Sequence, residues 1–265
     1  MKLKDKQVMN FLGIIPARYA STRFPGKSLA DLMGKPVIQW VYERVAGLLD
    51  RVVVATDDER ILNVVKGWGG EALLTSPDHP SGTDRCLEAC LKLKESYDVI
   101  INIQGDEPFI HSSQIELLKM AFQNSSTQIA TLVKPFSSDD DFEDLFNPNT
   151  PKVLINPKGQ AIYFSRSVVP YIRGKYHSEW SKSHIFYKHI GIYAYTYKVL
   201  NEIVALPQSV LEKAESLEQL RWIENGFVIQ TMPTNEETLG IDTPEDLEKA
   251  IEMAKHHIGG YPPTI

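Results

Sequence analysis

The chain has 265 residues, of which 43% are hydrophobic and 23% are charged, and its formal net charge is −6. This length suits one large globular domain, and the acidic balance excludes nucleic acid as the main partner, because a phosphate backbone favours a basic surface. The first residues are polar, and no run reaches the length of about 20 apolar residues that spans a membrane. We therefore expect a cytoplasmic protein without a membrane partner.

The first part of the chain alternates short apolar runs with helical patterns. Strands are expected where the runs are short and rich in β-branched residues, over 11–16, 51–56, 71–75 and 98–104. Apolar residues at helical spacing predict helices over 36–49, 57–69 and 82–96. Strands that alternate with helices form covered, mainly parallel sheets, so the pattern predicts an α/β fold.

After about residue 130 the pattern changes. Strand-like segments follow over 129–135, 151–165 and 189–196, with a turn signal at 156–159 and polar, irregular stretches between them. These segments predict an antiparallel insertion or subdomain. A helical pattern returns over 216–226, and a strand over 227–233 and a helix over 243–257, capped by Thr243, complete the expected elements.

The loop after the first expected strand, within IIPARYASTRFPGKS (14–28), ends like a phosphate-binding P-loop. A Walker A motif needs a glycine where Ser21 stands, and Pro25 removes a backbone N–H, so we reject a P-loop. Arg18, Arg23 and Lys27 nevertheless place three cations on one loop at the sheet edge where α/β proteins bind ligands. Forked guanidinium donors and a compact ammonium favour an anion site here over a solvated loop.

Acidic residues follow the strand expected at 98–104. Asp106 and Glu107 beside an anion site suggest Mg²⁺, which one or two carboxylates hold together with ligand phosphates, although a capping acid in a turn explains them equally well. Asp242 precedes a helix, where capping is the simpler explanation. Sequence spacing leaves open whether Asp106 and Asp242 meet.

Further polar residues lie on the expected turns and strands. Ser81, Gly82 and Thr83 offer hydroxyl and backbone donors to a ligand, whereas Asp84 and Arg85 are equally explained as a helix cap and a first-turn charge. The strand positions Arg166, His189 and Tyr193 and the helical segment 217–221 have ordinary structural explanations when each is taken alone.

Taken together, these motifs resemble one family of sugar nucleotidyltransferases, the CMP-KDO synthetases (3-deoxy-D-manno-octulosonate cytidylyltransferases). The matching segments keep the family's order from residue 11 to about residue 250. They are IIPARYASTRFPGKSL, VVVATDDE, SGTDR, NIQGDEPFI, FNPNTPKV, AIYFSR, HIGIYAY, LEKAESLEQLRWIENG and GIDTPEDLE. Departures from the family are small: Phe24 stands where leucine is common, and residues 174–187 match poorly.

The resemblance implies a Rossmann-like nucleotidyltransferase fold with a mainly parallel central sheet. One domain would span residues 1–265, with about 130–195 as a β-rich subregion that binds the sugar and forms a homodimer. The implied reaction transfers CMP from CTP to the anomeric hydroxyl of KDO, releases pyrophosphate and serves lipopolysaccharide biosynthesis. The implied cofactor is Mg²⁺, as one or two ions.

The resemblance also implies roles for individual residues. The family's catalytic positions are matched by Arg18, Lys27, Asp106 and Asp242, the last two as metal ligands. The nucleotide positions are matched by Arg18, Arg23, Lys27, Ser81, Gly82 and Gln104. The sugar positions are matched by Arg166, His189, Tyr193, Glu218 and Gln219.

Other functions remain open on the sequence alone. The same loop would serve a cytidylyltransferase for another acid sugar, such as 8-amino-KDO or sialic acid. A hexose-1-phosphate nucleotidyltransferase usually opens with a glycine-rich loop, which this chain lacks. A nucleotide-binding protein without catalysis is disfavoured by the retention of both candidate acids, Asp106 and Asp242.

Overall fold

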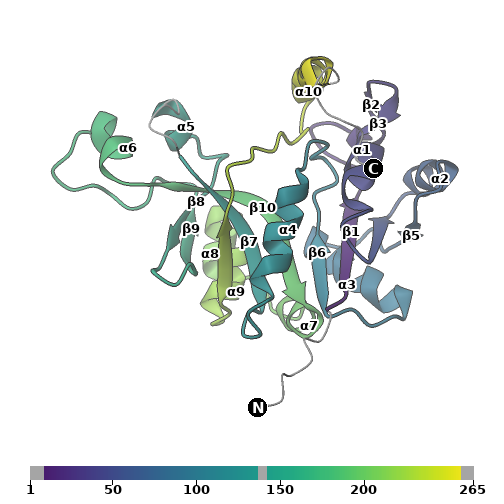
Figure 1. Cartoon of the computed structure of the whole chain (residues 1–265), viewed down its shortest axis with the longest axis horizontal. Helices are drawn as coiled ribbons and strands as arrows, with labels where there is room; N and C mark the ends of the chain where they lie inside the picture. Colours follow the sequence, from purple (N-terminus) through teal and green to yellow (C-terminus); the bar gives the residue numbers. More distant parts are fainter. Residues whose placement is uncertain (1–8, 137–141, 258–265) are drawn as a thin grey trace, which may run out of the picture. The chain divides into compact units, whose positions relative to one another are not determined.

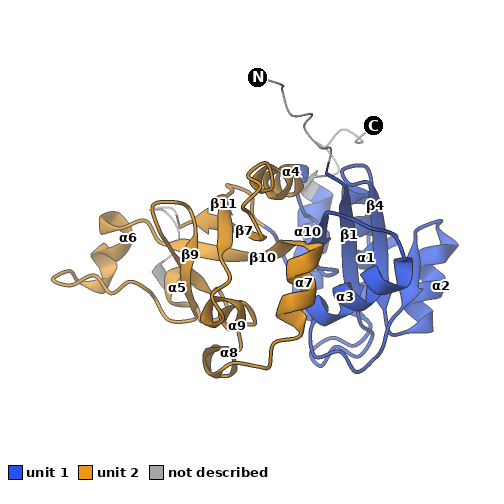
Figure 2. Cartoon of the chain, turned by 90° about the horizontal axis from the view of Figure 1, so that it is seen from below, with its two compact units in different colours: residues 1–112, 238–265 blue, residues 113–237 orange. Residues whose placement is uncertain are grey.

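The computed structural model describes residues 9–136 and 142–257, which fall into two compact units (Figures 1 and 2). Unit 1 comprises Met1–Ser112 and Thr238–Ile265, and unit 2 comprises Ser113–Glu237. The β-rich stretch expected at about 130–195 lies inside unit 2, whose bounds are wider.

Unit 1 is built on four parallel strands in the order β6–β1–β4–β5. Their bounds are β1 (Phe11–Ala17), β4 (Arg51–Thr56), β5 (Ala72–Leu74) and β6 (Val99–Asn102). Ile14 of β1 lies opposite Val53 on one side and Asn102 on the other. Adjacent residues Ile14 and Ile15 are both fully buried, as expected for a parallel sheet covered on both faces.

The helices of unit 1 begin at residues that satisfy their free N–H groups. α2 (Glu59–Gly67) is capped by Asp58, whose side chain accepts from the Arg60 N–H, and α3 (Gly82–Leu93) is capped by Ser81. α10 (Pro244–His257) is capped by Thr243, which accepts from the Asp246 N–H at 3.2 Å. The cap expected at Thr243 is confirmed.

Short elements extend unit 1 beyond its sheet. They are η1 (Lys27–Leu29), the ribbon of β2 (Asp31–Leu32) and β3 (Lys35–Pro36), and α1 (Val37–Val45). Ile241 and Ala250 share a buried cluster with Leu32 and Val37. This cluster holds the returning segment of the chain, residues 238–257, against the N-terminal part of the same unit.

Unit 2 is mainly antiparallel. β7 (Ile129–Pro135) pairs in parallel with β11 (Ile229–Pro233) and antiparallel with β10 (Tyr187–Thr196), and β8 (Lys152–Ile155) pairs with β10 and with β9 (Ala161–Ser165). Its helices are α4 (Ser112–Ala121), α5 (Phe142–Phe146), α6 (Trp180–Ser183), α7 (Tyr197–Val204), α8 (Val210–Glu215) and α9 (Gln219–Glu224), with the 3₁₀ turn η2 (His177–Glu179). The antiparallel character expected after residue 130 is confirmed.

Differences from the sequence expectation lie mainly in the helices. The single helical pattern expected over 216–226 is wrong at its start, because Ser216 takes a left-handed conformation (φ 50°) that separates α8 from α9. Neither α4 nor α7 was expected, and the stretch expected to be irregular contains η2 and α6. None of the described helices has both the length and the apolar character that crossing a bilayer requires.

Candidate functional site

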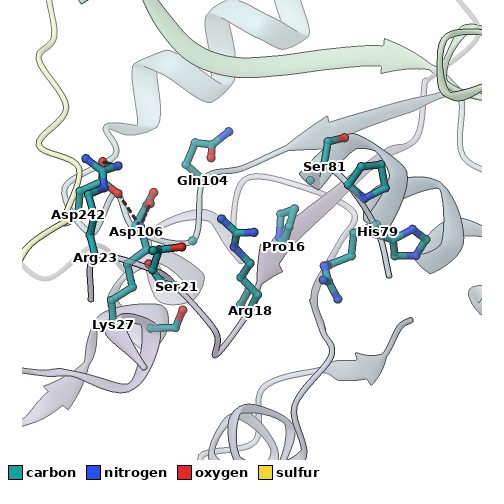
Figure 3. Close-up of a pocket in the computed structure, with 17 residues that line it drawn as sticks. Pro16, Arg18, Ser21, Arg23, Lys27, His79, Ser81, Gln104, Asp106 and Asp242 are labelled. Atoms are coloured by element: carbon teal, nitrogen blue, oxygen red, sulfur yellow. Dashed lines mark hydrogen bonds and ion pairs between the residues drawn. The ribbon is translucent and has the colours of Figure 1, made fainter. Parts of the chain in front are cut away.

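A pocket of about 350 Å³ opens at the carboxyl ends of the unit 1 strands (Figure 3). Lys27, Asp106 and Asp242 lie together at one end, and His79 and Ser81 lie at the other, with Arg18 between them. All of the expected catalytic and nucleotide positions line this pocket. They are Arg18, Arg23, Lys27, Ser81, Gly82, Gln104, Asp106 and Asp242.

The opening loop owes its shape to Gly26. This residue has φ +73°, and a Cβ there would lie 3.0 Å from the Tyr19 ring, so both conformation and space favour glycine. The Gly26 N–H donates to the Tyr19 carbonyl at 2.8 Å, and the Leu29 N–H donates to the Gly26 carbonyl at 2.8 Å. The loop therefore closes into η1, and Lys27 begins this turn with its side chain in the pocket.

Lys27 joins the two acids that the sequence could not place together. Its Nζ lies 2.5 Å from an Asp106 oxygen and 2.8 Å from an Asp242 oxygen, and Arg23 pairs with the other Asp242 oxygen at 2.9 Å. Burial lowers the pKa of Lys27, but the attraction of Asp106 and Asp242 outweighs it, so the net shift is upward. Lys27 therefore stays positively charged between the two carboxylates.

Backbone contacts bring Asp106 and Asp242 to the same end of the pocket. A Cβ on Gly105 would meet the Pro16 carbonyl oxygen at 2.8 Å, so glycine lets the loop before Asp106 approach β1. The Ile241 N–H donates to the Asp106 carbonyl at 2.8 Å, which places the next residue, Asp242, beside Asp106. Capping does not explain the Asp242 carboxylate, because Thr243 caps α10.

Glu107, the neighbour of Asp106, has a carboxyl group with a raised pKa. Burial, with a smaller contribution from Asp106, raises the pKa of Glu107 to about 8. Glu107 therefore keeps its proton more readily than an ordinary carboxyl group. Asp106 lines the pocket and pairs with Lys27, so Asp106 is the better candidate for a cation ligand.

The far end of the pocket contains a cap and a buried arginine. The Ser81 hydroxyl accepts from the N–H groups of Thr83 and Asp84 and donates to the Asp84 carboxylate at 2.5 Å, so it caps α3, while Ser81 still lines the pocket. Arg85, which the sequence left as a first-turn charge, also lines the pocket and is only 4% exposed. Its position on the buried face of α3, next to Cys86, is the signal that could have identified it.

The expected sugar positions all belong to unit 2. Arg166 follows β9, and its guanidinium donates to the backbone carbonyls of Glu215 at 2.6 Å, Pro148 at 2.8 Å and Ser216 at 3.3 Å. Within the described part of the chain, these contacts use three of its five N–H groups. Arg166 therefore has a clear structural role, because it holds the connection between α8 and α9.

His189 and Tyr193 lie on β10 and contact one another, with ring centroids 5.2 Å apart. Thr131 donates its hydroxyl proton to the Ile192 carbonyl at 2.8 Å, so His189 Nε2, 2.9 Å from the same hydroxyl oxygen, acts as the donor to it. Burial lowers the pKa of His189 to about 3 and raises that of Tyr193 well above its ordinary value. Both side chains are therefore neutral at physiological pH.

Glu218 and Gln219 lie at the start of α9. Glu218 accepts from Arg221 at 2.7 Å. Gln219 is 5% exposed, and its Nε2 has no hydrogen-bond partner among the described residues; the same is true of the indole N–H of Trp222. Buried donors normally have partners, so each of these two atoms is a candidate donor to a polar ligand.

The cytidylyltransferase family model matches residues 12–239 of this chain. The chain belongs to the cytidylyltransferase family. Two curated members are similar over almost their whole length, and both are named 3-deoxy-manno-octulosonate cytidylyltransferase. The protein from Parabacteroides distasonis is 66% identical over 92% of this chain and 98% of its own. The protein from Bacteroides thetaiotaomicron is 60% identical over 94% of this chain and 99% of its own.

Solved structures of the family agree with the fold. The structure of CMP:2-keto-3-deoxy-manno-octonic acid synthetase complexed with CTP matches with a TM-score of 0.85 and 42% identity, over 93% of this chain and 99% of that one. A cytidylyltransferase from Leptospira borgpetersenii, 17% identical with a TM-score of 0.59 over 97% of this chain and 100% of that one, shares the fold alone. The expected α/β nucleotidyltransferase fold with a mostly parallel central sheet is confirmed.

Proposed function

We propose that this protein transfers CMP from CTP to the anomeric hydroxyl of KDO, releasing pyrophosphate and so activating KDO for lipopolysaccharide biosynthesis. The observation that carries the proposal is the unit 1 pocket, where three loop cations face two carboxylates. It occurs in a chain 66% identical to a protein named for this reaction.

The triphosphate of CTP would bind at the loop end of the pocket. Arg18, Arg23 and Lys27 offer guanidinium and ammonium donors to phosphate oxygens. The same charges offset repulsion between the triphosphate and an anionic sugar and stabilise the charge that develops on the leaving pyrophosphate. The rest of the nucleotide would extend toward Ser81, Gly82 and Gln104.

Asp106 and Asp242 would hold Mg²⁺. Their carboxylates converge on one cation, Lys27, and all-oxygen ligands are what Mg²⁺ prefers. Within the described residues no group of three His, Cys, Asp or Glu side chains is arranged for a metal, which suits an ion whose remaining ligands are phosphate oxygens and water. When bound, Mg²⁺ polarises the phosphate oxygens and neutralises their charge. A second ion stays a prediction.

The sugar would bind through unit 2. The buried donors of Gln219 and Trp222, which lack partners among the described residues, support a polar ligand beside Tyr193, whose ring lies 5.0 Å from that of Trp222. Neutral His189 and Tyr193 and the acid Glu218 would contact sugar hydroxyls. Arg166 would donate hydrogen bonds to the sugar carboxylate from the N–H groups that do not contact backbone carbonyls.

Unit 2 would also form the homodimer. Three large apolar side chains between β9 and β10 are exposed, Tyr171 by 70%, Tyr176 by 82% and Ile185 by 60%. Exposed apolar side chains of this size would suit an interaction surface if they adjoin in the assembled protein. A dimer of this kind, and a location in the cytoplasm, stay predictions.

The decisive experiment is a pyrophosphate-release assay with CTP and Mg²⁺. KDO is expected to support the fastest turnover, ahead of 8-amino-KDO, sialic acid and hexose 1-phosphates. Faster turnover with another of these sugars would overturn the KDO assignment, and nucleotide binding without release from any of them would overturn the catalytic proposal.

The metal role has its own test in the same assay. Asp106→Asn and Asp242→Asn are expected to raise sharply the Mg²⁺ concentration needed for half-maximal rate, because each removes a charged ligand. An unchanged Mg²⁺ titration in both variants contradicts the assignment.

A further inference from the structure

One side chain, Lys27, contacts both carboxylates that the proposed function assigns to a metal ion. Its ammonium lies 2.5 Å from Asp106 and 2.8 Å from Asp242, and its side chain is only 14% exposed. Arg23 pairs with the second Asp242 oxygen at 2.9 Å. The negative charge of the pair is therefore already balanced by cations of the chain itself.

The backbone under Lys27 is fixed, whereas its ammonium can move. Gly26 holds the left-handed conformation that begins η1, and the Ala30 N–H donates to the Lys27 carbonyl at 3.1 Å. The lysine side chain ends in a compact charge on a flexible four-carbon stem. The ammonium can therefore leave the two acids for another anion in the pocket without any change in the loop.

An ammonium and a divalent cation compete for the same carboxylate oxygens. With Lys27 in place, an added dication meets one repelling charge within contact distance of both acids. A triphosphate in the pocket changes this balance, since it offers Lys27 several anionic oxygens and brings further ligands for the metal.

We propose that Lys27 is a placeholder cation, which holds Asp106 and Asp242 together and blocks divalent-cation binding until a triphosphate draws its ammonium away. This inference rests on the proposed function, because it takes the two carboxylates as the metal ligands. It assigns an order of events: the metal binds with the nucleotide or after it, and not before.

Mn²⁺ binding to the full-length protein, followed by the electron paramagnetic resonance signal of free Mn²⁺, tests this order. The wild-type protein without nucleotide is expected to bind Mn²⁺ weakly, and CTP is expected to strengthen the binding. Lys27→Met is expected to bind Mn²⁺ at least about tenfold more tightly than wild type without nucleotide, because one opposing charge is removed. Lys27→Arg keeps the charge and is expected to bind as weakly as wild type.

Two control variants test whether the gain in Mn²⁺ affinity arises at this site. Arg18→Met removes a cation of the same pocket that forms no ion pair with either acid among the described residues, so it is expected to leave Mn²⁺ affinity unchanged. Asp106→Asn in the Lys27→Met background is expected to abolish the gain. Circular dichroism checks folding, and Lys27→Gln replaces Lys27→Met if the latter does not fold.

The placeholder role is overturned if wild type without nucleotide binds Mn²⁺ as tightly as Lys27→Met, or if Arg18→Met gives the same gain. The outcome is separate from that of the pyrophosphate assay. A gain in Lys27→Met with no turnover of wild type on CTP and KDO overturns the proposed function alone, and turnover without the gain overturns the placeholder role alone.

Discussion

Arg85 ties α3 to the ends of two strands of unit 1, and its removal is expected to destabilise the protein strongly. Its Nη2 donates to the Asp57 carboxylate at 2.8 Å and its Nη1 donates to the Thr75 hydroxyl at 2.5 Å. Thr75 in turn donates to the Thr56 carbonyl at 3.1 Å. The side chains of Arg85 and Asp57 are only 5% and 14% exposed, so water replaces the lost partner only in part.

The magnitude follows from this burial. Removing one partner of a buried ion pair costs about 3–5 kcal/mol, because the other charge is left without compensation. Arg85→Met is therefore expected to lower the free energy of unfolding by about 3 kcal/mol, the low end of that range, since Asp57 keeps some contact with water. Asp57→Asn keeps a hydrogen-bond acceptor and is expected to cost about 1–2 kcal/mol.

Urea unfolding of the two single variants and the double variant measures these values. With a slope of about 2–3 kcal/mol per molar urea, Arg85→Met is expected to lower the midpoint by about 1 M. The double variant is expected to be more stable than the sum of the single losses predicts, by about 1–2 kcal/mol, because no unpaired charge remains. Additive losses, or a loss below about 1 kcal/mol for Arg85→Met, would refute the reasoning.

Three further predictions concern the loop, the cap and the buried histidine. Gly26→Ala is expected to cost about 1–2 kcal/mol of unfolding free energy, because of its positive φ and the Tyr19 ring, and to raise the KM for CTP; an unchanged KM would show that the loop shape does not matter. Ser81→Ala is expected to cost about 1 kcal/mol with little change in kcat, since its hydroxyl caps α3; a large loss of kcat at unchanged stability contradicts this. The folded-state pKa of His189, about 3, lies below its unfolded value, so its contribution to stability is present above about pH 6.5 and is lost as the pH falls toward 3. Unfolding free energy is expected to drop by about 2 kcal/mol between pH 7 and pH 5 from this group, and a His189→Gln variant with the same pH slope as wild type would rule that out.

Patterns between near neighbours determined much of the fold from the sequence alone. The strand over 51–56 and the caps at Asp58 and Thr243 follow from apolar runs and from side chains that satisfy N–H groups a few residues away. The spacing of residues 21–28 likewise excluded a P-loop. Helices α4 and α7 were not expected, although Thr196 caps α7 in the same way.

Only the tertiary structure decided which distant side chains meet. Asp106 and Asp242 come together because the Ile241 N–H donates to the Asp106 carbonyl, and Lys27 then reaches both acids. Arg85 is buried and lines the pocket, which its position in the sequence does not specify. Burial also lowers the pKa of His189 and so keeps its side chain neutral. The sequence identifies the residue types at these positions. Their charge states and partners depend on contacts between segments that are far apart in the chain.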